Sequence, residues 1–174
     1  MEKVILVDIE DREIGLMEKM QAHKEAKLHR AFSVFLLNDK NEVLLQKRAI
    51  DKYHCGGMWT NTCCSHPRAG ETLQEAVDRR LYEEMGIVCD TKWIYSFIYK
   101  ADVGEGLFEH EFDHVFFGRF SDQAKPDKSE VSDWEYVAIE DLKQDVAVNP
   151  SKYTPWFKII LAEVIDKGIL AKVA

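Results

Sequence analysis

The clearest periodic pattern of hydrophobic and polar positions lies between residues 71 and 87. In "ETLQEAVDRRLYEEMGI", Leu73, Val77, Leu81 and Met85 recur every four residues and therefore share one helical face. Gly86 follows them directly, and glycine is a common residue just past a helix end. This segment is predicted to be an amphipathic helix.

Two other segments have helical character. Residues 155–167 place Pro155 at a first turn and Trp156, Ile160 and Val164 on or near one face, which predicts a second amphipathic helix. The stretch "IGLMEKMQAHKEAKLH", residues 14–29, is rich in Lys, Glu and Met and is also compatible with a helix.

The remaining periodic segments read as strands. "EKVILVDIED" opens with an apolar run of strand length, and "AFSVFLLNDKNEVLLQKR" contains two β-rich runs around a polar turn at residues 38–41. Further strands are predicted at 93–99, 108–120 and 134–139, whereas residues 53–70 lack a sustained period and are expected to be loop. Strands mixed with a few helices, without regular βαβ alternation, predict an α+β fold or a mixed-sheet sandwich.

Composition narrows the class of protein. A chain of 174 residues, 46% hydrophobic, is long enough for one buried core, so we expect a single domain over residues 1–174. The apolar runs are too short to span a membrane, and the N-terminus lacks the layout of a secretory signal, so a cytoplasmic protein is expected. A formal net charge of −8 argues against nucleic acid as a partner.

The stretch "WTNTCCSHPRAGET", residues 59–72, carries two adjacent cysteines and a histidine ahead of the predicted helix. It is compatible with a zinc knuckle, a disulfide corner or the reactive turn of an enzyme. A reducing compartment disfavours the disulfide, and the absence of a second Cys/His pair at zinc-finger spacing disfavours the knuckle. Either cysteine is also compatible with a simple buried role.

The segment "LFEHEFDHVFF" alternates with period two. Glu109 and Glu111 therefore share one face of the predicted strand, and His110 and His114 share the other. A metal site that uses both glutamates is not expected to use His110. The alternative for paired glutamates on a strand is a solvated face.

Three histidines precede the predicted helix, and with the two glutamates they make five candidate metal ligands: His23, His29, His66, Glu109 and Glu111. This donor set suits octahedral Mn, Mg or Zn better than a closed tetrahedral structural zinc site. Each histidine taken alone is more often an ordinary buried or solvated side chain.

The helix at 71–87 resembles the Nudix box, a loop and helix that hold a divalent metal against a diphosphate. The matching positions are Glu71, Arg79, Leu81, Glu83, Glu84, Gly86 and Ile87. Two positions depart from the pattern. Ser65 replaces the opening Gly, and Arg80 replaces a Glu that is a metal ligand in hydrolases. The resemblance therefore implies a site that holds a diphosphate without the usual hydrolysis.

Several motifs in order resemble the type I isopentenyl-diphosphate Δ-isomerases, a Nudix-superfamily family, from about residue 3 to 165. They are "AHKEAKLHRAFS", "WTNTCCSHP", "EHE" ahead of "VFF", and "TPW". The interval from His23 to His29 is one residue shorter than usual. The family's Asn-x-x-Cys-x-His turn matches Asn61, Cys64 and His66, which selects Cys64 as the reactive thiol.

The resemblance implies a Nudix-like α/β/α sandwich with a mixed sheet and a role for each matched residue. The implied metal ligands are His23, His29, His66, Glu109 and Glu111. Glu84 matches a residue that contributes to a second Mg2+, which arrives with the diphosphate. The implied proton-transfer residues are Cys64 and Glu111, with Tyr99 beside the glutamate, and Trp156 is the indole over the isoprenyl carbons. The implied diphosphate contacts are Lys19, Arg48, Lys52 and Arg80. By its helical spacing alone, Trp156 would be a core residue.

The implied reaction interconverts isopentenyl and dimethylallyl diphosphate through a tertiary carbocation, and the expected partner is this small molecule, bound by a monomer. Two alternatives are kept: a Nudix diphosphohydrolase, and a non-catalytic module that binds metal or diphosphate. The hydrolase would release phosphate. The module would bind its ligand and tolerate loss of Cys64.

Overall fold

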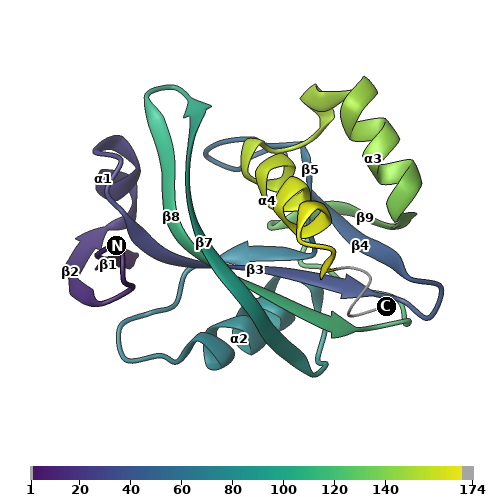
Figure 1. The fold of residues 1–174 in the computed structure, drawn as a ribbon, viewed down its shortest axis with the longest axis horizontal. Coiled ribbons are helices and arrows are strands. Elements are labelled where there is room, and N and C mark those ends of the chain that lie inside the picture. Colours follow the sequence, from purple (N-terminus) through teal and green to yellow (C-terminus); the bar gives the residue numbers. More distant parts are fainter. Residues whose placement is uncertain (1, 170–174) are drawn as a thin grey trace.

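The computed structural model describes residues 2–169, which form one curled mixed sheet with helices on both of its faces (Figure 1). The strands are β1 (Lys3–Val7), β2 (Glu13–Glu18), β3 (His29–Leu37), β4 (Glu42–Arg48), β5 (Trp59–Thr60), β6 (Cys63–Ser65), β7 (Thr91–Gly104), β8 (Leu107–Arg119) and β9 (Val131–Ala138). The helices are α1 (Lys19–Lys24), α2 (Leu73–Met85), α3 (Ile139–Val148), the 3₁₀ turn η1 (Pro150–Lys152) and α4 (Pro155–Asp166).

Strand β3 is the centre of the sheet. It pairs antiparallel with β1, β4 and β6 and parallel with β8, and β8 pairs in turn with β7. Strand β2 extends the sheet beyond β1, while β5 and β9 pair with β4. The parallel register sets His29 beside Glu111, so the topology brings two of the predicted ligands together.

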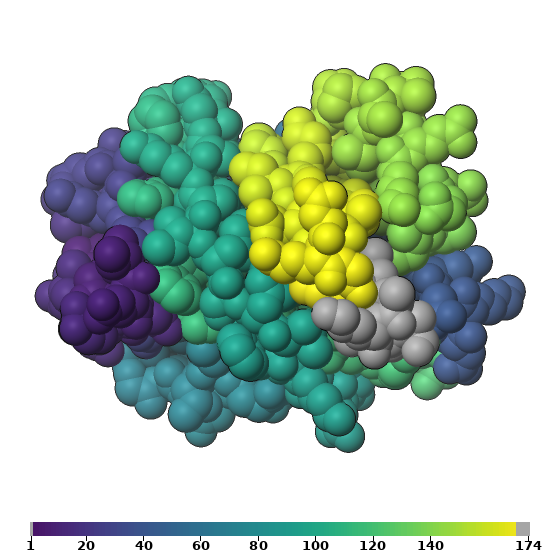
Figure 2. Space-filling model, in the orientation of Figure 1, coloured from purple at the N-terminus to yellow at the C-terminus, as the bar shows by residue number. Residues whose placement is uncertain are grey.

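Alternate residues of β3 feed two hydrophobic cores. Val34 and Leu36 pack on the α2 side, and Phe35 and Leu37 pack on the side covered by α3 and α4. Figure 2 shows α4, in yellow, lying against the teal β7–β8 hairpin on this second face. The α+β, three-layer arrangement predicted from the sequence is therefore confirmed.

Helix α2 matches its prediction closely. Thr72 and Glu75 form a reciprocal capping box at its N-terminus, and Gly86 ends the helix in the left-handed conformation at φ 64°. Val77, Leu81 and Met85 are buried, as their spacing predicts. The helix is fixed at both ends, and it carries the predicted box residues along one flank. Helix α4 also falls where it was predicted.

The interpretation of residues 14–29 as one helix is wrong. Residues 13–18 form β2, which pairs with β1 through Leu6 and Gly15, and α1 covers only residues 19–24 before Ala26 turns the chain at φ 49°. The free edge of β1 offers a ladder of backbone hydrogen bonds, and this outweighs the weak helix propensity of Lys, Glu and Met.

Two smaller differences follow from the same competition between local and tertiary preference. Residues 53–70, expected to be loop, contain the short strands β5 and β6. The strand predicted at 134–139 stops at Ala138, and the unpredicted helix α3 starts at Ile139. Among the described helices, none is long and apolar enough to cross a membrane.

Candidate active site

Three imidazoles converge on one point between β3 and β8. His23 lies on α1, His29 begins β3, and His66 follows β6 directly; all three are buried. The Nε2 atoms of His29 and His66 are 3.2 Å apart. The shortened interval between His23 and His29 is accommodated because α1 ends at Lys24 and the chain turns at once into β3.

Backbone carbonyls fix which nitrogen two of the three rings turn toward the cluster. The Nδ1 atom of His23 lies 2.7 Å from the Lys19 carbonyl, and that of His29 lies 2.8 Å from the Lys27 carbonyl. Because a carbonyl only accepts, each of these two Nδ1 atoms carries a proton, and Nε2 is the nitrogen that each ring turns toward the cluster. The Nε2 atoms of His29 and His66 converge at 3.2 Å, and this geometry suits ligands that share an ion.

The two glutamates join this cluster from β8. His23 Nε2 is 2.9 Å from Glu109 Oε2, and His66 Nε2 is 3.0 Å from Glu111 Oε1. Two adjacent ligands that are each about 2.1 Å from an ion lie roughly 3 Å apart in an octahedron. His23, His29, His66 and Glu109 bring their ligand atoms within 4.8 Å of one another, and Glu111 lies alongside them. The donor set fits a divalent metal.

The predicted alternation of β8 holds in the structure. Glu109 and Glu111 are buried toward the cluster, whereas the Nδ1 atom of His110 contacts the Ala26 carbonyl at 2.8 Å. His114 faces Asp11 and Ser96 instead, at 3.0 and 2.8 Å. Neither of these two histidines reaches the metal cluster.

Burial and neighbouring charges drive the pKa values of the two glutamates apart. Burial raises the pKa of Glu111 well above its usual range, and the nearby carboxylates of Glu109 and Asp113 add to this. Burial also acts on Glu109, but contacts with His23 and His54 hold its pKa well below the usual range. Two carboxyl groups with divergent pKa values at one site are suited to different roles.

Burial lowers the pKa of two of the imidazoles, to about 4 for His29 and well below the usual range for His66. Both rings are therefore neutral near pH 7, which is the form that binds a metal.

Tyr99 and Cys64 lie beside Glu111 in one cavity. The Tyr99 hydroxyl donates to Glu111 Oε2 at 2.6 Å, because β7 and β8 place these residues directly opposite each other. The Cys64 thiol donates to Asn61 Oδ1 at 2.8 Å and lies 3.6 Å from Ser33 Oγ. Burial raises the pKa of the Cys64 thiol.

Trp156 lies at the N-terminal turn of α4 and forms a wall of the same cavity. Its indole N–H donates to Thr60 Oγ1 at 3.0 Å, which fixes the ring. The Arg48 guanidinium lies 5.2 Å from the ring centroid, a cation–π distance. The indole is buried and also faces the cavity. Trp156 is therefore both a core residue, as its helical spacing predicts, and a wall of the cavity, as the family resemblance implies.

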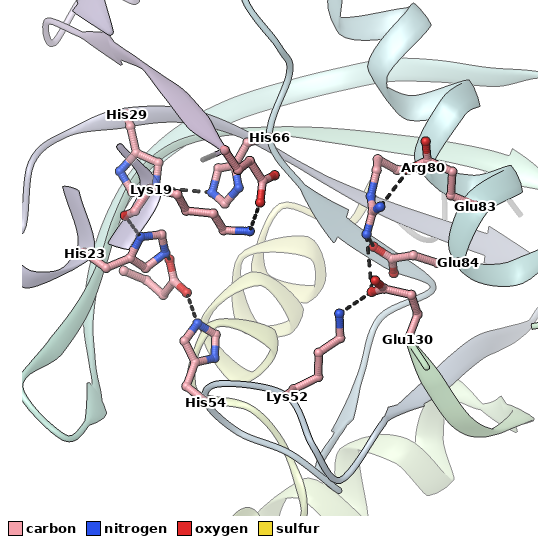
Figure 3. Close-up of polar contacts among 12 residues, drawn as sticks. Lys19, His23, His29, Lys52, His54, His66, Arg80, Glu83, Glu84 and Glu130 are labelled. Atoms are coloured by element: carbon pink, nitrogen blue, oxygen red, sulfur yellow. Dashed lines mark hydrogen bonds and ion pairs between the residues drawn. The ribbon is translucent and has the colours of Figure 1, made fainter. Parts of the chain in front are cut away.

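Lys52 and Arg80, two of the predicted diphosphate-binding residues, lie on the other side of the cavity from the imidazoles. Figure 3 shows the imidazoles on one side of the view, and Arg80, Glu84, Glu130 and Lys52 on the other. Arg80 is 2.5 Å from Glu84 and 2.7 Å from Glu83, and Lys52 forms an ion pair with Glu130.

The other two basic positions also face the cavity. Lys19 and Arg48 are among its lining residues, together with Lys52 and Arg80. Glu84 is buried and accepts a hydrogen bond from Gln46 at 2.8 Å. All of the predicted site residues except His23 and His29 line this cavity, and those two lie next to it through Glu109 and His66.

Sequence reasoning missed His54 and Glu130. His54 lies 2.9 Å from Glu109, and Glu130 contacts both Lys52 and Arg80. The signal for His54 was its place two residues after Lys52 in a loop already rich in site residues. Glu130 stands just before β9 with no pattern around it, and only the pairing of β9 with β4 brings it to the cavity.

Comparison with known proteins agrees with the fold. The NUDIX domain matches residues 27–157. Among solved structures, a protein of Deinococcus radiodurans superposes with a TM-score of 0.78, at 17% identity, over 93% of this chain and 98% of that one. The MutT protein of Methanosarcina mazei gives a TM-score of 0.65, at 20% identity, over 81% and 94% of the two chains. These likenesses show the fold, and the chain belongs to the Nudix family.

Closer relatives specify the branch of that family. The isopentenyl-diphosphate Delta-isomerase of Burkholderia multivorans is 47% identical over 92% of this chain and 91% of its own length. The proteins of that name from Photobacterium profundum and Photorhabdus laumondii are 47% and 48% identical, over 95% and 92% of this chain and 96% and 90% of their own lengths. Within the Nudix family, the chain is therefore an isomerase of this kind.

Proposed function

We propose that this chain interconverts isopentenyl and dimethylallyl diphosphate with Cys64 and Glu111 as its two proton-transfer groups. The observation that carries the proposal is that both side chains line one cavity walled by Trp156. Moving the double bond requires one proton to be added at the end of the alkene and another to be removed from C2. Such a step needs an acid and a base that reach the same five-carbon unit.

Glu111 is assigned the delivery of the proton. Burial raises the pKa of this carboxyl and so favours its protonated form, and the Tyr99 hydroxyl at 2.6 Å holds it in place. Cys64 is assigned the removal of the proton from C2 in its thiolate form; because burial raises the pKa of this thiol, the cations of the cavity would have to stabilise the thiolate. The hydrogen bond from its thiol to Asn61 fixes the direction of the sulfur.

Trp156 is assigned the stabilisation of the carbocation. The intermediate carries a positive charge that the substrate's alkene lacks, and an indole face stabilises such a charge by about 2 kcal/mol when water is excluded. Water would also destroy the cation, so the buried position of Trp156 serves both requirements.

The proposed metal ligands are His23, His29, His66, Glu109 and Glu111, with Mn2+, Zn2+ or Mg2+ as the ion. The convergence of imidazole Nε2 atoms and carboxylate oxygens supports this set. A bound cation would supply positive charge that tunes the acidity of Glu111.

The diphosphate is assigned to the side of the cavity where Lys52 and Arg80 lie, with Lys19 and Arg48 as further cations of the same lining. Glu84 would contribute to a second ion, Mg2+, that arrives with the diphosphate. Arg80 forms ion pairs with Glu83 and Glu84, two carboxylates of the box. A cation in this place disfavours the alternative of a Nudix diphosphohydrolase, because it replaces a ligand that hydrolysis needs.

We further propose that the protein acts as a cytoplasmic monomer, with residues 1–174 as one domain and without nucleic acid or a membrane as a partner. The single sheet that all described strands share supports the one domain, and the net charge of −8 supports the exclusion of nucleic acid.

The direct test is incubation of the purified protein with isopentenyl diphosphate and Mg2+. Formation of the allylic, acid-labile product without phosphate release is the expected result. Release of inorganic phosphate or diphosphate would show the hydrolase instead. Binding of the substrate without turnover, unchanged in Cys64→Ala, would show a non-catalytic module.

A further inference from the structure

A fourth imidazole lies at the metal cluster. His54 Nε2 is 2.9 Å from Glu109 Oε1, while His23 Nε2 is 2.9 Å from the other oxygen, Oε2. The two rings thus contact the two oxygens of one buried carboxylate, and Figure 3 shows His23 and His54 on the same side of the view. The His54 side chain is only 5% exposed, and it lines the cavity.

Neighbouring side chains set the orientation of this ring. His54 packs edge-on against Tyr53, with centroids 4.2 Å apart, and against Trp156, with centroids 5.4 Å apart. The Arg48 guanidinium donates to the His54 carbonyl at 3.3 Å. Both ring nitrogens of His54 are buried. Within the described chain, Nε2 approaches only Glu109, and Nδ1 has no hydrogen-bond partner. A buried imidazole aimed at a carboxylate in this way needs an explanation.

We propose that His54 is a positioning residue for metal binding, which holds Oε1 of Glu109 so that Oε2 faces the ion beside His23. The inference rests on the metal site of the proposed function. A ligating carboxylate is normally held by an outer hydrogen-bond donor, and loss of such a donor weakens metal affinity. His54 supplies the donor on the oxygen that the cluster does not use.

His54 is not itself a ligand in this arrangement. Among the described residues, the group whose ligand atoms lie within 4.8 Å of one another contains His23, His29, His66 and Glu109, and it does not contain His54. Its ring approaches the carboxylate from the side of Trp156. His54 therefore connects the metal cluster with the wall of the substrate cavity.

The loop that holds His54 also holds Lys52, a proposed diphosphate contact. This loop is tightly folded, since a Cβ at Gly56 would overlap the Ile50 carbonyl. One short segment thus positions a donor for the metal ligand and a cation for the diphosphate.

Two substitutions of His54 separate the contribution of its hydrogen-bond donor from that of its packed ring. His54→Phe keeps the packing against Trp156 and Tyr53 but removes the donor, and we expect the dissociation constant for Mn2+ to rise roughly 10- to 100-fold. His54→Gln keeps an N–H donor, and we expect it to stay within a few-fold of the wild type. Cys55→Ser, a neighbour on the same loop that does not line the cavity, is the matched control and should bind like the wild type.

The measurement is competition between chelator-treated protein and a chelator of known affinity for Mn2+, with the melting temperature of each metal-free variant as a check on folding. An unchanged dissociation constant in His54→Phe would overturn the proposal. Equal losses in the Phe and Gln variants would also overturn it, since that result identifies a direct ligand. If the wild type binds no Mn2+, the metal site itself is refuted.

Discussion

Cys63 and Cys64 are adjacent in β6, yet their side chains lie on opposite faces of the sheet. Cys63 is buried in the core beneath α2, and Cys64 lines the cavity. We expect Cys64→Ala to lower kcat by roughly 10²- to 10⁴-fold, the usual contribution of a proton-transfer group, without a change in melting temperature. Cys63→Ala should keep most of the activity and lose some stability. Steady-state kinetics and thermal melts check both, and equal loss of activity would contradict the assignment.

Substitutions of Trp156 distinguish an indole that stabilises the positive charge of the carbocation from one that only packs in the core. Trp156→Phe keeps an aromatic ring with a weaker quadrupole, so kcat should fall more than substrate affinity, and Trp156→Leu should lower kcat further. Kinetics with isopentenyl diphosphate and melting curves of both variants provide the measurement. A Leu variant with near-normal kcat and a much lower melting temperature would show a structural role instead, as large-to-small changes in a core do.

Some site residues could be predicted from the sequence, and others could not. The ligand set could be named because His66 lies in a recognisable turn and the two glutamates alternate along a strand. His54 could not be named, because its place two residues after Lys52 does not by itself distinguish it from a solvated loop histidine. Its role depends on how its loop folds against Glu109 and Trp156.

At the level of the element, alternate side chains of strand β8 lie on opposite faces of the sheet. Glu109→Gln should lower bound Mn2+ and isomerase activity together, because it removes the charge of a proposed ligand. His110→Gln should leave the metal content unchanged, since that ring contacts the Ala26 carbonyl. Elemental analysis of the two purified variants decides this. A requirement for His110 would contradict the alternation.

Helix α2 ends at a glycine with little space around it. A Cβ at Gly86 would meet the Lys125 carbonyl oxygen at 2.6 Å, whereas one at Gly70 would meet nothing within 4 Å; both residues have positive φ. Gly70→Ala should cost about 1 kcal/mol of unfolding free energy from backbone strain alone. Gly86→Ala should cost clearly more. Urea unfolding of the two variants measures the difference, and equal costs would show that the close approach relaxes freely.

The elements that were predicted well are those whose pattern and end signals agree. Helix α2 has an apolar stripe, a capping pair and a stop glycine, so little else could override it. Strand β2 has exposed Ile14 and Leu16 on an edge, so its own sequence carries no sign of the strand it pairs with. Its conformation is decided by β1, which no local window contains.

For the whole molecule, the buried imidazoles predict how stability depends on pH. Burial lowers the pKa of His29 from 6.5 to about 4, so the folded state resists protonation more than the unfolded state does. The resulting stability is fully present above pH 6.5 and is lost as the pH falls toward 4. It amounts to something on the order of 3 kcal/mol.

The comparison of metal-free wild type with His29→Gln isolates this contribution. Buried carboxyls act in the opposite direction, since burial raises the pKa of Asp113 to about 7, and both proteins share that effect. We expect the unfolding free energy of the wild type to fall relative to the variant between pH 6.5 and 4. Urea midpoints measured across that range test it, and parallel curves would contradict it.

The parallel pairing of β3 with β8 has a consequence for the order of folding. His29 and Glu111 are distant along the chain and become neighbours only when this crossover closes. Long-range strand pairing is slow, because the entropy of loop closure is lost before the contacts form. No hairpin or isolated helix can gather the imidazoles and carboxylates beforehand. A refolding chain is thus expected to acquire its affinity for a divalent ion late, which would make ion uptake a kinetic marker of the completed sheet.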